Sequence, residues 1–201
     1  GVSIMPFHYM FSEVAICLAS SWGAIRLFRA HQAIGAIGVA LFAIAATIGV
    51  IRIATGANEI LAPVHRFASQ AGGTFALVLI VSQIAKHLQW KPSILAILAS
   101  AAVAGLVAFA GGVLGALVFL ALLACGTLLL ATNSHSRGRA LAVIGFASMA
   151  PNILFVRQSP ILDPALSWHA YHVITALWLI AIVAALHPAP SHSANLLRAN
   201  G

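Results

Sequence analysis

Apolar residues occur in seven long runs along the chain, and short segments with Gly, Pro, Asn or basic residues separate these runs. Each run has about 17–25 residues, the length with which an α-helix crosses about 30 Å of hydrocarbon. Gly111 and Gly112 form the break between the fourth run and the fifth. The pattern predicts seven membrane-spanning helices, at residues 7–28, 33–55, 60–85, 93–109, 113–132, 139–157 and 164–186.

The composition indicates that lipid is the solvent of this chain. Of its 201 residues, 62% are hydrophobic and 6% are charged, and the mean hydropathy is +1.04. Soluble domains have about 25% charged residues, and no water-soluble fold of this size buries so much apolar surface. We therefore predict an all-α polytopic membrane protein, with a seven-helix transmembrane domain over residues 1–187 and a flexible tail over 188–201.

The distribution of charge predicts the orientation of the helices. Ten Lys and Arg residues and three acidic residues give a net charge of +7. The basic residues stand singly at the ends of the apolar runs, which is typical of topology signals and of headgroup contacts, and not of nucleic-acid binding. With the N-terminus outside and the C-terminus inside, the positive-inside rule is satisfied, and we expect a bacterial inner membrane. The inner ends then hold Arg26, Arg29, Lys86, Lys91, Arg137, Arg139 and Arg198, and the outer ends hold Arg52, Arg66 and Arg157.

Polar residues from distant parts of the sequence fall at similar depths in the predicted helices. Glu13 lies in the first helix, His65 and Ser69 in the third, and His169 and His172 in the seventh, all in the outer third of the membrane. A carboxylate inside a membrane span is costly unless it is paired, bound to a ligand or protonated. The shared depth predicts a polar site near the outer leaflet.

The types of these residues favour a metal site. Neutral imidazole is the commonest metal ligand, and three histidines with one open position are typical of catalytic zinc. We expect His65, His169 and His172 to bind zinc, with Glu13 as general base or fourth ligand. The interpretations without a metal remain open: Glu13 could be protonated or paired with an arginine, and the two histidines of the last helix could belong to an aromatic belt.

Three further residues complete the predicted site. Ser69 follows His65 by four residues on the same helix face and could support a ligand or donate to an oxyanion. Arg52 and Arg66 lie at outer helix ends, where they could bind the anionic headgroup of a membrane lipid. The predicted substrate or ligand is therefore a membrane lipid that reaches the site from the outer leaflet, while protein partners are not indicated by the sequence.

The segment WHAYHVITALWLIAIV, residues 168–183, resembles the last helix of the CREST superfamily of seven-helix membrane hydrolases. This superfamily includes alkaline ceramidases and the progestin and adipoQ receptors, and its last helix has a His-rich motif before an apolar run. The resemblance implies a zinc-dependent amidase that acts on a lipid within the membrane, and His172 matches the second histidine of the motif. The seven helices and their orientation also agree with the alkaline ceramidases.

The chain differs from that superfamily at three points. The histidines of its last helix are three residues apart, whereas those of the superfamily are four apart. The predicted second helix contains no histidine, and the third contains no aspartate. His65 would have to replace the missing ligand of the second helix from the third helix.

Two other function classes are compatible with the same residues. In a haem or redox protein, His65 and either His169 or His172 would be axial ligands, and Arg52 and Arg66 would neutralise the propionates. In a non-catalytic subunit, receptor or transporter, the polar pocket would bind a ligand without chemistry. Enzymatic activity is therefore an open question from the sequence, with metal-dependent lipid hydrolysis as the expected reaction.

Overall fold

The computed structural model describes residues 6–132 and 139–186, and every element within these ranges is helical. The predicted tail at 188–201 lies outside the described residues. The elements are α1 (Tyr9–Arg29), α2 (Ala33–Thr55), α3 (Asn58–Phe67), η1 (Ala68–Gly72), α4 (Gly73–His87), α5 (Ile94–Ala110), α6 (Gly112–Thr132), α7 (Arg139–Ala147), α8 (Met149–Pro151), η2 (Asn152–Val156) and α9 (Pro164–Leu186), where η denotes a π-helical turn.

Each of the seven predicted ranges contains a helix. Within the described part of the chain, five helices are long and apolar enough to cross a membrane: Tyr9–Arg29, Ala33–Thr55, Asn58–His87, Gly112–Thr132 and Pro164–Leu186. Two further helices, Ile94–Ala110 and Ala140–Val156, are apolar but shorter. The protein is therefore all-helical in its described part, with five candidate membrane-spanning helices.

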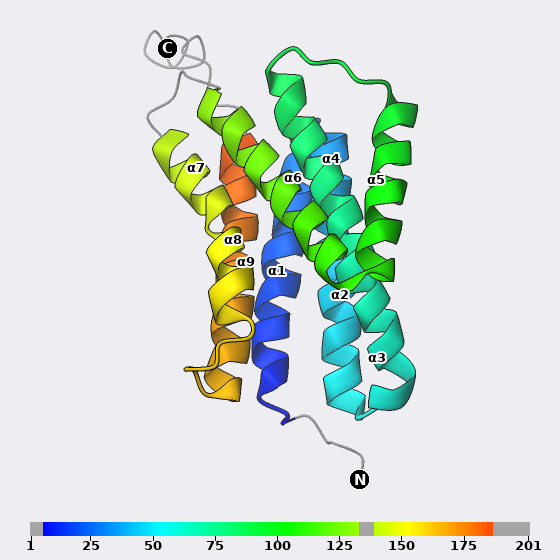
Figure 1. Ribbon diagram of the computed structural model, residues 1–201, viewed down its shortest axis with the longest axis vertical. Coiled ribbons are helices and arrows are strands. Elements are labelled where there is room, and N and C mark those ends of the chain that lie inside the picture. Colours follow the sequence, from blue (N-terminus) through cyan, green and yellow to red (C-terminus); the bar gives the residue numbers. More distant parts are fainter. Residues whose placement is uncertain (1–5, 133–138, 187–201) are drawn as a thin grey trace, which may run out of the picture.

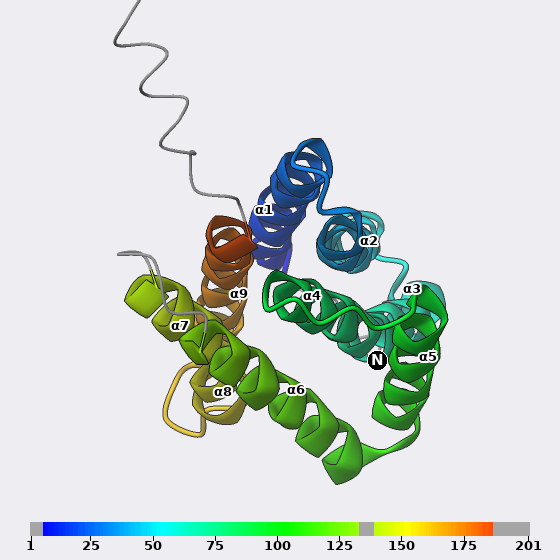
Figure 2. The same cartoon turned by 90° about the horizontal axis from the view of Figure 1, so that it is seen from above.

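The helices form a ring in which each one packs against its neighbours. Going round the ring, α1 contacts α2, which contacts α4, followed by α5, α6, α7 and α9, and α9 returns to α1. The α4 helix also contacts α6, and Figure 2 shows it toward the middle of the bundle. Its inner residues include Leu77, Ile80 and Ile84, which are at most 1% exposed and form the core with Trp178 of α9. The start of α1 and the end of α9 lie at opposite ends of the bundle (Figure 1).

The hairpin between α5 and α6 confirms the predicted break at Gly111 and Gly112. Gly112 has a φ of +41°, which a residue with a side chain rarely adopts. A Cβ added at Gly115 would lie 2.7 Å from the carbonyl oxygen of Ala108, so the two helices approach closely because Gly115 has no side chain. Small residues are typical of close helix packing in membranes.

Two helical rods contain a π-helical turn, which the apolar pattern did not predict. The η1 turn joins α3 to α4, and η2 follows α8. Pro63 within α3 also lacks the N–H that a helix interior uses. Such turns are rare and are frequent at functional sites, and residues of both turns line the same cavity.

Candidate functional site

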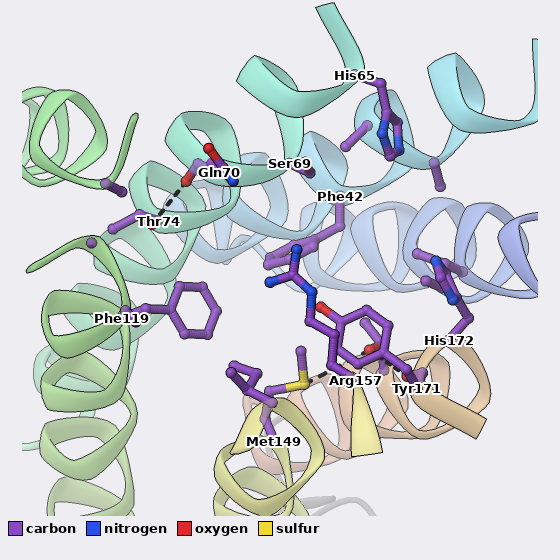
Figure 3. Close-up of a pocket in the computed structure, with 18 of the residues that line it drawn as sticks. Phe42, His65, Ser69, Gln70, Thr74, Phe119, Met149, Arg157, Tyr171 and His172 are labelled. Atoms are coloured by element: carbon purple, nitrogen blue, oxygen red, sulfur yellow. Dashed lines mark hydrogen bonds between the residues drawn. The ribbon is translucent and has the colours of Figure 1, made fainter. Parts of the chain in front are cut away.

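A cavity of about 380 Å³ lies at the end of the bundle where α1, α6 and α9 begin. Its wall contains residues of α1, α2, the α3–η1–α4 rod, α5, α6, α8, η2 and α9. Figure 3 shows His65, His172, Arg157 and Tyr171 among the side chains that surround it. Residues separated by more than a hundred positions therefore contribute to one internal space.

Glu13 of α1 is the acidic residue at the base of this site, and it is 2% exposed. Its carboxylate lies flat against α2, because a Cβ added at Gly49 would be 2.7 Å from Oε1 and 3.0 Å from Oε2. Any other residue at position 49 would occupy the space that the carboxylate fills. Gly49 was not among the residues predicted for the site, since a glycine in an apolar helix gives no chemical signal.

Two imidazole rings converge on one oxygen of Glu13. His172 Nε2 lies 3.3 Å from Oε1, and His65 Nε2 lies 3.6 Å from the same oxygen. His172 is 6% exposed, and the side chain of His65 is 16% exposed. Three residues that are far apart in the sequence, on α1, α3 and α9, thus meet at a single buried atom.

The hydrogen bond at Nδ1 of His172 determines which ring nitrogen carries the proton. Nδ1 lies 2.7 Å from the carbonyl oxygen of Trp168, so Nδ1 carries the proton and donates it to that oxygen. In the neutral ring Nε2 then carries a lone pair and no proton. This lone pair faces a lone pair on Glu13 Oε1. This oxygen is buried and has no hydrogen-bond partner within the described residues. A cation between the two atoms, either a proton or a metal ion, would remove the repulsion.

The donor types around Glu13 are those that bind zinc, the metal implied by the sequence resemblance. Zinc–ligand bonds of about 2.0–2.1 Å place neighbouring donors of a tetrahedral site about 3.3 Å apart, close to the two Oε1–Nε2 distances of 3.3 and 3.6 Å. Two histidines and a glutamate are a known catalytic zinc set. Within the described residues, however, no group of three or more His, Cys, Asp or Glu side chains is placed to hold a metal ion, so both rings would have to move toward the carboxylate to complete such a site.

His169 lies apart from this cluster. Its Nδ1 is 3.1 Å from Ser12 Oγ, and its Nε2 is 2.9 Å from His8 Nδ1. Because the Ser12 hydroxyl donates to the carbonyl of Tyr9, His169 Nδ1–H donates to Ser12, and Nε2 accepts from His8. Both ring nitrogens of His169 are therefore engaged with α1 and with the residue before it, away from Glu13.

The other predicted site residues occupy different positions. Ser69 lines the cavity, as does His65 one turn earlier, and its hydroxyl donates to the carbonyl of Arg66. Neither Arg52 nor Arg66 belongs to the cavity wall, and Arg66 is exposed. The basic side chain that does line the cavity is Arg157, which the sequence identified only as a charge at an outer helix end.

Hydrogen bonds and ring contacts fix the α9 side of the cavity. The Asn152 side chain, which is 1% exposed, donates from Nδ2 to the carbonyl oxygen of Tyr171 at 3.0 Å and to Thr175 Oγ1 at 3.3 Å. Trp168 stacks on Tyr9 with ring centroids 5.0 Å apart, and its Nε1 donates to the Tyr9 carbonyl. These contacts hold α9 against both η2 and α1, and they set the rotation at which His172 faces the cavity.

Comparison of the chain with family models, with curated proteins and with solved structures gives no match.

Proposed function

We propose that this protein is a zinc-dependent membrane hydrolase that cleaves an amide or ester bond of a lipid-like molecule. The observation that supports the proposal is the convergence of His65 Nε2 and His172 Nε2 on the buried Oε1 of Glu13, at the wall of a cavity. A buried carboxylate oxygen that lacks a hydrogen bond is costly unless a cation neutralises it. Glu13 takes the place in the ligand set that we had expected for His169.

The residues of the cavity have separate roles in this reaction. His65, His172 and Glu13 Oε1 hold the metal, and the carbonyl of Trp168 keeps the His172 ring in the tautomer that presents Nε2. Bound zinc supplies a water of near-neutral pKa and polarises the scissile carbonyl. Glu13 is the acidic residue among those that line the cavity, so its Oε2 is the atom that receives the water proton. Hydrolysis adds the water oxygen to the carbonyl carbon, breaks the C–N or C–O bond, and delivers this proton to the leaving atom.

The same proposal includes a topology. We place all seven helical rods across a bacterial inner membrane, with the N-terminus outside and the C-terminus inside, in accordance with the positive-inside rule. The start of α9 and the end of α2 then lie on the outer side, and the cavity opens at the level of the outer leaflet. A lipid would reach it from the bilayer without crossing an aqueous layer.

The geometry gives less support to haem. An iron with two axial histidines needs an open space between their nitrogens for the porphyrin. Here the carboxylate of Glu13 contacts Nε2 of both His65 and His172, so an acidic side chain fills that space. A proton-sharing Glu–His cluster in a transporter is the second candidate, and the 3.3 Å contact with His172 favours it.

Metal analysis separates these functions, and the last helix offers a matched control. The wild-type protein, His172→Ala and His169→Ala would be purified in detergent and analysed for zinc by mass spectrometry, after dialysis against zinc and then against buffer. We expect about one zinc per wild-type chain, the same for His169→Ala, and a loss of tenfold or more for His172→Ala, because changing even the hydrogen-bond partner of a metal ligand lowers metal affinity about 10–100-fold.

Other results would contradict the proposal. Equal zinc in wild type and His172→Ala would exclude this site, and the absence of zinc from all three proteins would favour the proton-sharing cluster. A Soret band in the purified protein would favour haem. Circular dichroism of each variant would show whether the helical fold persists, so that loss of metal is not confused with unfolding.

A further inference from the structure

The ionisable side chains of the cavity wall lie apart from the α5–α6 hairpin (Figure 3). They are Glu13, His65 and His172 together with Arg157 and Tyr171. At the α5–α6 hairpin the wall has small residues and one ring, with the uncharged polar side chains of Gln70 and Thr74 nearby (Figure 3); the hairpin residues are Ala108, Gly112, Gly115, Ala116 and Phe119. This separation suits an amphiphile, because its charged end would meet the ionisable groups and its chain would meet the uncharged hairpin.

Arg157 places a positive charge in the cavity wall, which favours binding of an anion. Among the described residues it is the one lysine or arginine in the cavity wall, and its guanidinium lies 5.6 Å from the centre of the Tyr171 ring. Figure 3 shows this guanidinium beside Tyr171, on the cavity side of η2. The ion pairs recorded within the described residues join Glu13 to the two histidines and leave Arg157 without an acidic partner.

The position of Arg157 also limits the distance, within one ligand, between an acidic group bound to Arg157 and the ester or amide bond to be cleaved. Tyr171, which Arg157 overlies, is the neighbour of His172 in α9, and the two rings have centroids 5.1 Å apart. Because both residues contact the same Tyr171 ring, an acid held by Arg157 and a carbonyl held beside His172 would belong to one compact polar headgroup. A molecule whose acidic group is separated from its ester or amide by a long headgroup fits this spacing less well.

From these observations we infer that the cavity binds a fatty acyl chain joined by an amide or ester to a small acidic group, with Arg157 binding the acid and the α5–α6 hairpin contacting the acyl chain. This inference rests on the proposed hydrolase, since it names the class of substrate for that site. Gly112 and Ala116 are exposed at one rim of the cavity, and Arg157 is exposed at the other. Both ends of the ligand would thus have access from the surrounding bilayer and its interface.

Binding without turnover tests the inference. N-lauroylglycine, which is acidic, and the matched neutral N-lauroylglycinamide would be titrated into the His172→Ala protein in detergent, with calorimetry as the readout. We expect the acid to bind about tenfold more tightly, the order of magnitude of one charge-assisted hydrogen-bond pair. The additional variant Arg157→Gln should remove this preference, whereas Arg157→Lys should keep part of it.

Arg66→Gln is the control, because Arg66 is an exposed cation outside the cavity, and it should leave the preference unchanged. Equal binding of the acid and the amide to the parent protein would overturn the inference without any need for an arginine variant. Displacement of N-lauroylglycine by inorganic phosphate alone, at similar concentration, would also overturn it, because the site would then be a simple anion site. Zinc content is measured separately, so a failed hydrolase proposal and a failed ligand inference give different results.

Discussion

At the scale of single residues, the most demanding feature is a carboxylate buried within an apolar helix bundle. Burying an unpaired charge costs several kcal/mol, so Glu13 must gain compensating interactions in the folded protein. Two histidines lie beside Oε1, where a shared cation would join them to the carboxylate, and Gly49 leaves the space that the carboxylate fills. The function of the site therefore depends on a residue that has no functional group.

The space at Gly49 leads to a first prediction about stability and metal binding. Gly49→Ala places a methyl group within 2.7 Å of Glu13 Oε1, so the carboxylate must move away from α2. We expect a destabilisation of about 1–3 kcal/mol, as for other overpacked cores, together with a loss of zinc. Thermal unfolding in detergent and zinc analysis of the same preparation would measure the two effects.

Gly72→Ala provides a control for that experiment. Gly72 also has helical backbone angles, but a Cβ there would have no atom within 4 Å. The control should keep its zinc and its unfolding temperature, or gain slightly because alanine is the better helix former. Wild-type zinc content in Gly49→Ala would mean that the carboxylate does not contribute a ligand.

At the scale of helices, η2 and α9 are joined through one buried amide. Asn152 donates to the Tyr171 carbonyl and to Thr175, and Asn152 precedes Arg157 by little more than one turn. This pair of hydrogen bonds thus positions both a cavity wall and the proposed anion-binding residue. Hydropathy could not predict it, because a single asparagine near a helix end looks like any interfacial polar residue.

Asn152→Leu tests this connection between elements. It keeps a similar volume but removes both bonds from Asn152 Nδ2, while the Tyr171 carbonyl still accepts from the Thr175 hydroxyl. We expect a loss of about 1–2 kcal/mol of stability, measured by thermal unfolding in detergent, because the net contribution of two buried hydrogen bonds exceeds the gain from removing Oδ1, which is buried without a partner within the described residues. Asn58→Leu, at the half-buried start of α3, should change stability by less than about 0.5 kcal/mol, as surface substitutions do. Equal effects at the two positions would contradict the role of Asn152.

The sequence predicted the positions of the helices along the chain better than the directions of their side chains. Lengths of apolar runs predicted helices in all seven ranges, and five of these ranges hold a helix in the described part of the chain that is long and apolar enough to cross a membrane. The rotation of a helix about its axis was not predicted for α9, which is apolar on all sides, and the shared depth of His169 and His172 therefore did not distinguish them. The Trp168 and Asn152 contacts determine that rotation, and they come from other helices. The π-helical turns were missed because they change hydrogen bonding without changing hydropathy.

At the scale of the whole molecule, the number of crossings and the orientation of the chain together decide at which leaflet the cavity opens. The α5 helix, at 17 residues, and the composite rod Ala140–Val156 are the short members of the ring. Short apolar helices can still cross when the bilayer thins locally or flanking residues reach the interface, at a modest free-energy cost. Packing on α4, α6 and α9 would provide part of the compensation.

Labelling of single cysteines would count these crossings. In a chain with Cys17→Ala and Cys125→Ala, Ile161→Cys would place a thiol in the loop before α9, where Ile161 is 90% exposed. Trp90→Cys would place one in the loop between α4 and α5, where Trp90 is 68% exposed. We expect a membrane-impermeant maleimide to label position 161 in spheroplasts and position 90 only in inside-out vesicles.

Three rods separate these two positions along the chain: α5, α6 and the rod that runs from α7 to η2. Labels on opposite sides therefore require that one or all three of them cross, and labels on the same side would mean that a short rod turns back within the membrane. The reverse pattern, with position 161 inside, would put the cavity at the inner leaflet. Glu13 and Arg157 would then face lipids of the cytoplasmic side, and the proposed substrate would have to be made or delivered there.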